Sequence, residues 1–171
     1  MKEAASRHDE AVERYLRNQV TDPSSRWCGS MPDAYGLHEP GSASGAFQVF
    51  TAAYLQPLSK YHQSAEVLER IRLAAGHLDR VQTPDGNVDL LITNFNSPPD
   101  VSFVTVGLAP AVALARQANR KDIEGMIEPF LGRAGTALVN GGVHTPNHRW
   151  VACAALASLY ELYREEAYAH R

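Results

Sequence analysis

The sequence predicts an all-α fold, an array of about three antiparallel helical hairpins. Apolar residues recur at three- and four-residue spacing through most of the 171 residues, which is the period of an amphipathic helix. Amphipathic segments also alternate with segments that are apolar nearly all round. The latter begin near Ser44, Asp100 and Asn147, at intervals of roughly 56 and 47 residues, a period typical of stacked helical hairpins.

The amphipathic segments are expected to form outer helices, at about residues 2–20, 63–81 and 120–138. Each places its apolar side chains on one stripe between charged residues, as a surface helix does. Each also stops at residues that end helices. These stops are Thr21-Asp22-Pro23, Thr83-Pro84-Asp85-Gly86 and Asn140-Gly141-Gly142.

The apolar segments are expected to form inner helices, at about residues 45–56, 101–117 and 147–163. A helix that is apolar on nearly all sides is buried on most faces. The middle segment also allows a short strand over 101–106, where Val, Thr and Phe gather, and Pro110 would kink a helix there. We favour the helix.

Long loops rich in Gly, Pro, Asn, Asp and His occupy residues 21–44, 82–100 and 139–146, whereas the joints at 57–62 and 117–120 are short. In an antiparallel array the three long loops lie at one end, together with the first turns of the inner helices. A rigid scaffold that positions polar loops can build a binding face. The alternative is that these loops are tolerated insertions.

Composition narrows the class of protein. Apolar residues make up 44% of the chain and charged residues 20%, which favours one globular domain spanning residues 1–171. A net charge of −3 argues against nucleic acid as a partner. Of the 16 cationic side chains only three are lysines, and arginine is the side chain that grips planar carboxylates in a fork.

The first segment and the two cysteines allow predictions about localisation and disulfide bonds. The charged first segment lacks the apolar region of a signal peptide, and no 18 consecutive residues are apolar, so we expect no membrane partner and a cytoplasmic chain as written. Cys28 and Cys153 are too few for a disulfide scaffold. Cys153 lies in an apolar run and is expected to be a small core residue.

The stretch 139–151 holds the first set of candidate site residues. Asn147 is predicted to cap the helix that follows Pro146, with His148, Arg149 and Trp150 in its first turn and His144 just before it. The positive end of the helix dipole and the free backbone N–H groups favour an anion such as a carboxylate there. The alternative is a capping Asn beside a surface His and Arg.

The stretch 82–100 holds the second set, rich in amide and carboxylate side chains. Such groups bind sugar hydroxyls, yet they are equally the usual turn residues, and for most positions we favour the turn. Residues 88–92 alternate too poorly to predict a strand. The residues are Gln82, Asp85, Asn87, Asp89, Asn94, Asn96 and Asp100.

The stretch 26–45 offers Arg26, Trp27, Asp33, Tyr35, His38 and Glu39. Trp27 and Tyr35 are candidate platforms for sugar rings, although we expect Trp27 to fold back onto the core.

Metal and cofactor motifs are absent from the sequence. His144 and His148 are four apart, but Pro146 separates them from a common helix, and there is no HExxH motif. No GxSxG turn or GxxxxGK loop occurs. We predict neither a metal nor a cofactor.

The chain resembles the N-terminal α/α-toroid domain of heparinase II/III-like polysaccharide lyases. The resemblance rests on Asn147-His148-Arg149 before an apolar helix, on the alternation of outer and inner helices, and on the turn from Gln82 to Gly86. It covers about residues 60–165 and implies an incomplete α/α toroid that acts on glycans containing uronic acid by β-elimination.

The resemblance also implies roles for single residues. Asn147 would neutralise the C5 carboxylate and His148 would be a base or second neutraliser. Arg149 would be a substrate or structural contact. Together with the two polar loops, this makes the predicted substrate-binding residues Arg149, His144, Trp150, Gln82, Asp85, Asp89, Asn94 and Asn96. The catalytic tyrosine of such lyases lies in helices beyond the Asn-His pair, which this chain does not reach. The resemblance therefore allows either a ring completed by another copy or a domain without catalysis.

Two other hypotheses remain open. A toroidal glycoside hydrolase would need two carboxylates across a cleft, with Asp85, Asp89 and Asp100 as candidates. A non-catalytic helical-repeat module would bind a protein or a small ligand through the loop face, with Asn147 only a cap.

Overall fold

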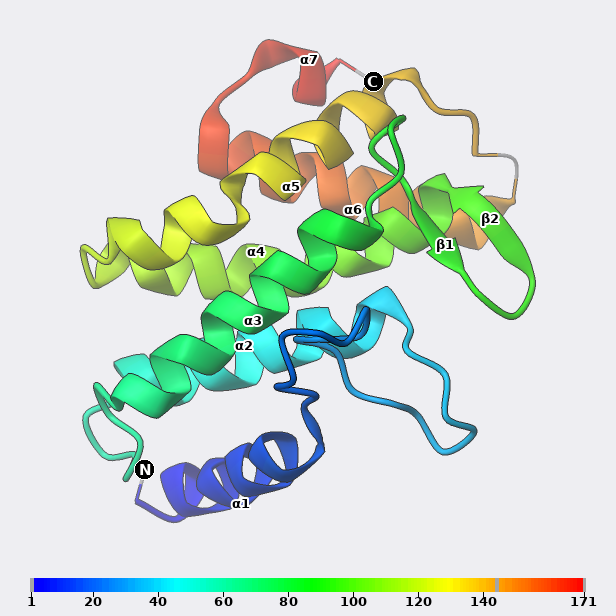
Figure 1. The fold of residues 1–171 in the computed structure, drawn as a ribbon. Helices are drawn as coiled ribbons and strands as arrows, with labels where there is room; N and C mark the ends of the chain where they lie inside the picture. Colours follow the sequence, from blue (N-terminus) through cyan, green and yellow to red (C-terminus); the bar gives the residue numbers. More distant parts are fainter. Residues whose placement is uncertain (1, 144, 171) are drawn as a thin grey trace.

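The computed structural model describes residues 2–143 and 145–170 and is helical over most of that length, which confirms the all-α class (Figure 1). All six expected helices are present, with ends shifted by up to five residues. A short helix near the C-terminus and a two-stranded hairpin were not predicted. The elements are α1 (Lys2–Asn18), α2 (Pro40–Leu55), α3 (Ala65–Val81), β1 (Val88–Leu90), β2 (Asn94–Ser97), α4 (Pro98–Gln117), α5 (Lys121–Asn140), α6 (Pro146–Tyr163) and α7 (Glu166–Ala169).

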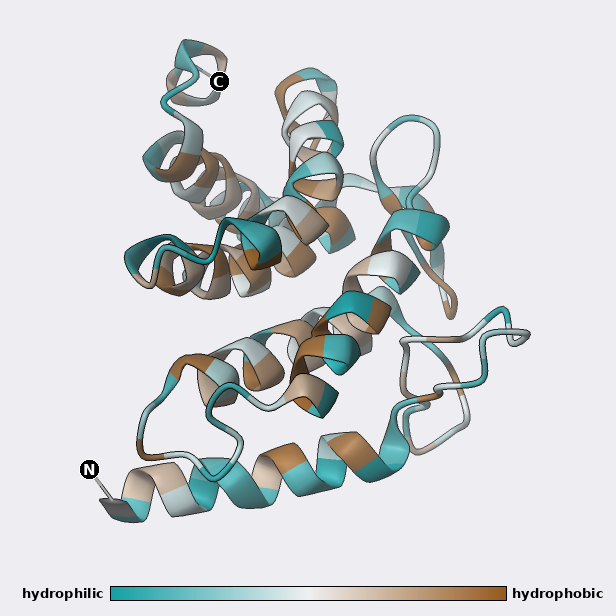
Figure 2. Cartoon of the chain, turned by 60° about the vertical axis from the view of Figure 1, so that its left-hand side comes forward, coloured by the Kyte–Doolittle hydropathy of each residue, from teal (hydrophilic) through white to brown (hydrophobic). Residues whose placement is uncertain are grey.

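The helices form two packed rows. Helices α2, α4 and α6 pack against one another in succession, while α3 packs on α2 and α5 packs on α4 and α3. Helix α1 closes one end of the array against α2, and α7 packs on α6 and α5 at the other end (Figure 2). The predicted alternation of inner and outer helices is therefore present.

Each helix of the inner row begins at a proline, namely Pro40, Pro98 and Pro146, so these helices start five, three and one residues earlier than expected. Proline suits the first turn because its missing N–H has no partner there and its φ is already helical. Helix α4 continues from Pro98 through Pro110, so the strand considered for residues 101–106 is wrong.

The core lies between the two rows and consists of large side chains that are almost fully buried. Burial of such side chains supplies most of the stabilisation of a helical array. The largest include Phe47 and Phe50 of α2, Ile71 and Leu78 of α3, Leu108 of α4, and Phe130 and Leu131 of α5.

Helix α6 departs from the prediction that it is buried on most faces. It buries Ala155, Leu156 and Leu159, whereas Trp150 is 80% exposed and Cys153 is exposed as well. The expectation that Cys153 is a core residue is therefore wrong. The reason is positional, because α6 is the last helix of the inner row and packs on α4 along one side only.

Helix α4 is also long and apolar enough, by length and composition, to cross a membrane. Half of the relevant window is buried inside the fold, as in the central helix of a packed array.

The long loops gather at one end of the array (Figure 1). The loop before α2, the β hairpin before α4 and the segment before α6 all lie on the right-hand side of that view, and the short joints lie on the left. Strand β1 pairs with β2 in antiparallel fashion, with Val88 opposite Ser97 and Leu90 opposite Asn94. The backbone N–H of Leu91 donates to Glu39 Oε2 at 3.2 Å, which ties the hairpin to the first loop.

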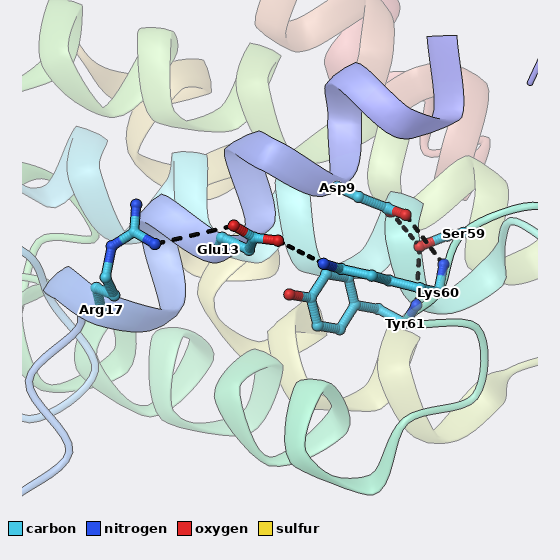
Figure 3. Close-up of polar contacts among 6 residues, drawn as sticks. All are labelled: Asp9, Glu13, Arg17, Ser59, Lys60 and Tyr61. Atoms are coloured by element: carbon cyan, nitrogen blue, oxygen red, sulfur yellow. Dashed lines mark hydrogen bonds and ion pairs between the residues drawn. The ribbon is translucent and has the colours of Figure 1, made fainter. Parts of the chain in front are cut away.

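One buried carboxylate, that of Asp9, holds helix α1 against the short joint that follows α2, away from the long loops (Figure 3). Asp9 is 8% exposed. Ser59 Oγ donates to its Oδ1 at 2.5 Å, and the backbone N–H of Lys60 donates to Oδ2 at 3.0 Å. The Lys60 ammonium pairs with Glu13 at the surface, where an ion pair contributes little.

Replacing Asp9 by Ala should lower the free energy of unfolding by about 2–4 kcal/mol, because two hydrogen bonds to a carboxylate are lost and the buried Ser59 hydroxyl and the partly buried Lys60 N–H lose their partner. Urea unfolding followed by circular dichroism measures this change. Glu13→Ala, which removes the exposed pair on the same helix, should leave the midpoint close to that of the wild type. Equal midpoints for the two variants would contradict the role given to Asp9.

Candidate functional site

A cavity of about 350 Å³ opens at the loop end, and we call it the loop-end cavity. It lies between the loop that precedes α2, the last turn of α3 and the β hairpin. Its lining includes Arg26, Trp27, His38, Arg80 and Asp89. This combination of cations, aromatic rings and a carboxylate is the main concentration of reactive and ligand-binding groups at this end.

Close packing against α3 fixes the loop that forms one wall. Gly29 has φ +92°, and a Cβ there would lie 1.8 Å from the Leu73 carbonyl oxygen. The Gln19 amide donates to Gly29 O at 3.0 Å, and the Arg80 guanidinium donates to Cys28 O. Only glycine allows this approach, so the loop backbone rests directly on the helix.

Three planar groups stack in this wall. The imidazole of His38 lies 4.7 Å from the Trp27 ring at an interplanar angle of 7°, and the guanidinium of Arg26 lies 4.3 Å from the same ring centroid. Trp27 is half-buried in this stack, rather than folded into the core as expected. The stack stiffens the wall and carries one cation.

The two arginines of the cavity are exposed, and neither has a carboxylate partner among the described residues. Neither Arg26 nor Arg80 forms a salt bridge within the residues that the structure describes, and both line the cavity. Elsewhere most arginines on the helices pair with Glu or Asp. Two guanidinium groups without carboxylate partners give this cavity its capacity for an anion.

A second cavity of about 230 Å³ adjoins the first and shares Pro40 and Asp89 with it. Its lining includes three carboxylates, Glu39, Asp89 and Asp100. Asp89 Oδ1 accepts from the backbone N–H of Asn96 at 2.7 Å. Three carboxylates favour hydroxyl or cationic groups over anions, so the two cavities differ in the ligands they attract.

Most of the polar residues of 82–100 hold the hairpin together. Asn96, with φ +50°, donates through Nδ2 to Asp85 Oδ2 at 2.9 Å and accepts from Thr83 Oγ1 at 2.8 Å. Asn94 donates to Ser97 Oγ at 2.8 Å, and Gln82 donates to Gly86 O at 2.8 Å. These side chains are engaged as turn residues, the interpretation favoured from the sequence. Of the candidates in residues 82–100, all of them described, only Asp89 lines the loop-end cavity.

The residues around Asn147 lie at the start of α6. The cap is Thr145, with extended backbone, because Pro146 occupies the first helical position. The prediction that Asn147 caps this helix is therefore wrong, and its side chain is exposed. His148 Nδ1 lies 2.6 Å from Thr145 Oγ1, and Arg149 Nε donates to Val143 O at 3.1 Å. The candidate residue His144 lies outside the described residues.

No hydrogen bond or shared cavity joins Asn147 or His148 to the residues of 82–100 in the described part of the chain. Arg149 lines a separate cavity of about 230 Å³ beside Cys153. Among the described residues, no three His, Cys, Asp or Glu side chains are placed to hold a metal ion.

Comparisons of this chain with known proteins identify no relative. No protein family matches this chain, and neither a curated protein nor a solved structure is significantly similar to it.

His77 of α3 lies beneath the stack, fully buried, and neither ring nitrogen has a hydrogen-bond partner. Its ring centroid is 6.4 Å from that of Trp27. Burial, together with the neighbouring charges of Arg80 and His38, lowers the pKa of His77 from 6.5 to about 4. The folded protein therefore requires His77 to be neutral.

Acid should destabilise the fold through this residue. An unfolded chain binds a proton on His77 near pH 6.5, whereas the folded chain does so near pH 4, so stability falls as the pH drops through that window. His77→Phe keeps a ring but does not titrate, and its melting temperature should fall less between pH 7 and pH 4.5. His62→Gln, at the opposite end, should behave like the wild type. The same fall in all three proteins would show that His77 is not the cause.

Proposed function

We propose that the chain is a carbohydrate-active domain that binds acidic saccharides in the loop-end cavity. The observation that carries this proposal is the pair of arginines without carboxylate partners, Arg26 and Arg80, in one cavity with the Trp27–His38 stack. A uronic acid presents both a planar carboxylate and a ring with apolar C–H faces.

The chemistry of the lining supports this ligand class. Guanidinium groups bind a carboxylate through two parallel N–H donors. Aromatic walls pack against sugar rings, and Asp89 Oδ2 has no partner among the described residues and is free to accept from a sugar hydroxyl. A volume of about 350 Å³ lies within the range of small-ligand pockets.

The reaction class that fits such a ligand is β-elimination, as the resemblance to heparinase II/III-like lyases implies. Neutralising the carboxylate makes the adjacent C5–H more acidic. In this proposal Arg26 and Arg80 neutralise the carboxylate. Asn147 and His148, the pair implied by the resemblance, are the alternative neutraliser and base at the start of α6.

Arg26→Ala should weaken binding of a uronic acid oligosaccharide by about tenfold, the loss expected for one charge-assisted contact. Isothermal titration calorimetry measures the affinity. Arg72→Ala is the matched control, because Arg72 is exposed, pairs with Glu69 and does not line the cavity. Asn147→Ala tests the α6 alternative, and a loss of binding there with full binding by Arg26→Ala would overturn the proposed location.

A non-catalytic interaction module is the second candidate function. Helices α4 and α6 expose large apolar side chains, with Phe103 57%, Leu114 42% and Trp150 80% exposed. Exposed apolar patches are common at interfaces. A second copy packed on the open side of α6 would extend the array and cover Trp150.

Sedimentation velocity tests this candidate. Self-association that grows with concentration in the wild type, and is lost in Trp150→Glu, is the expected result because a buried charge opposes the contact. Tyr35→Ser, which alters an exposed aromatic in the loop, should leave the association unchanged. A wild-type protein that is monomeric at every concentration would remove this candidate.

A further inference from the structure

A chain of hydrogen bonds at the loop end orients His38. Its Nδ1 lies 3.3 Å from Ser30 Oγ, which lies 3.1 Å from Ser42 Oγ. Ser42 Oγ in turn lies 2.8 Å from Glu39 O, and it also accepts from the backbone N–H of Met31 at 3.4 Å. Ser30 is fully buried, so the chain is shielded from water at its centre.

Counting hydrogens along this chain fixes the protonation of the imidazole. A carbonyl oxygen can only accept, so Ser42 uses its single hydroxyl hydrogen on Glu39 O. Ser30 must then donate its hydrogen to Ser42, which leaves Ser30 Oγ as an acceptor toward His38. The ring therefore carries its proton on Nδ1, and Nε2 holds the free lone pair.

The free nitrogen belongs to the loop-end cavity. Nε2 is on the side of the ring away from Ser30, His38 lines the cavity, and Nε2 has no partner among the described residues. Stacking on Trp27 holds the ring plane. A neutral imidazole with a fixed tautomer and an open Nε2 is the arrangement of a general base.

Burial favours the neutral form of the His38 imidazole. Burial lowers the pKa of His38 below its ordinary value, and the Asp33 carboxylate of the same loop acts weakly in the opposite direction. From α3, Arg80 and His77 face the same region, and Arg26 and Asp89 contribute from the loop and the hairpin.

We propose that His38 is the proton-abstracting base of the loop-end cavity, with Ser30 and Ser42 as positioning residues. The inference rests on the proposed acidic saccharide function. It assigns the base to His38 in place of His148, whose Nδ1 lies against Thr145 on exposed α6.

The step balances without a further reactant. His38 Nε2 takes the C5 proton of a uronic acid whose carboxylate contacts Arg26 and Arg80. The C–H electron pair forms the C4–C5 double bond, and the C4–O4 bond breaks with its electrons on O4. The imidazolium or water then returns one proton to O4, so that nothing is oxidised or reduced.

Nitrogen-15 NMR of the full-length chain reads the tautomer directly. The expected result is the Nδ1–H tautomer for His38 in the wild type, with a change toward the other tautomer in Ser30→Ala because the acceptor for Nδ1–H is lost. His62 serves as the reference signal at the opposite end of the array. A wild-type His38 protonated on Nε2 would overturn the assignment.

Activity then separates the base from the binding site. A uronic acid oligosaccharide is incubated with each variant, and absorbance of the unsaturated product is followed alongside calorimetric affinity. His38→Gln should lose about 100-fold or more in turnover while its affinity stays within about threefold, and Ser30→Ala should shift the pH profile. His62→Gln should match the wild type in both readouts, and His148→Gln tests the alternative base at the start of α6.

The outcomes are distinct. Binding by the wild type without any product, or full turnover by His38→Gln, overturns the base and leaves the binding proposal standing. Loss of turnover in His148→Gln alone moves the base to α6. Absence of binding by the wild type overturns the proposed function and the base together, whatever tautomer is observed.

Discussion

The close approach of Gly29 to α3 is the contact on which the loop end depends. With a Cβ at that position only 1.8 Å from the Leu73 carbonyl oxygen, any other residue would push the loop away from the helix. The loop carries Trp27 and His38, whereas α3 supplies Arg80. The cavity exists because this one backbone contact brings the two segments together, and the Arg80 bond to Cys28 O then holds them.

Much of the fold was predictable because it depends on local patterns. The helical period of residues 63–81 and the stop at Thr83-Pro84 predict α3 within two residues, since a stripe of apolar side chains must face a partner. The predicted starts of α2 and α4 were less accurate. These helices begin at Pro40 and Pro98, and the residues between each proline and the predicted start show only weak apolar periodicity. The β hairpin was missed because Asn96, with its positive φ and four-way bonding, completes a turn that no local alternation indicates.

The candidate site was less predictable because its parts are far apart in the sequence. Arg80 looked like one more charge on an amphipathic helix, and its contact with Cys28 spans 52 residues. His38 was noted as one of several reactive side chains, but its tautomer depends on Ser30 and Ser42, whose role is visible only once the loop is folded. Asn147 and His148 were adjacent and therefore conspicuous, yet adjacency in the sequence brought them no partner from 82–100.

The two adjoining cavities constrain how a saccharide would lie across the loop end. Among the described residues, the loop-end cavity has two guanidinium groups without carboxylate partners, whereas the neighbouring cavity has three carboxylates, and Asp89 lines both. A chain of uronic acids would be attracted at one end and repelled at the other. One acidic ring held by Arg26 and Arg80, followed by a neutral or cationic ring beside Glu39 and Asp100, satisfies both cavities. Under the proposed function, this charge asymmetry would favour a mixed saccharide over a uniformly acidic polymer and would place the acidic ring beside His38.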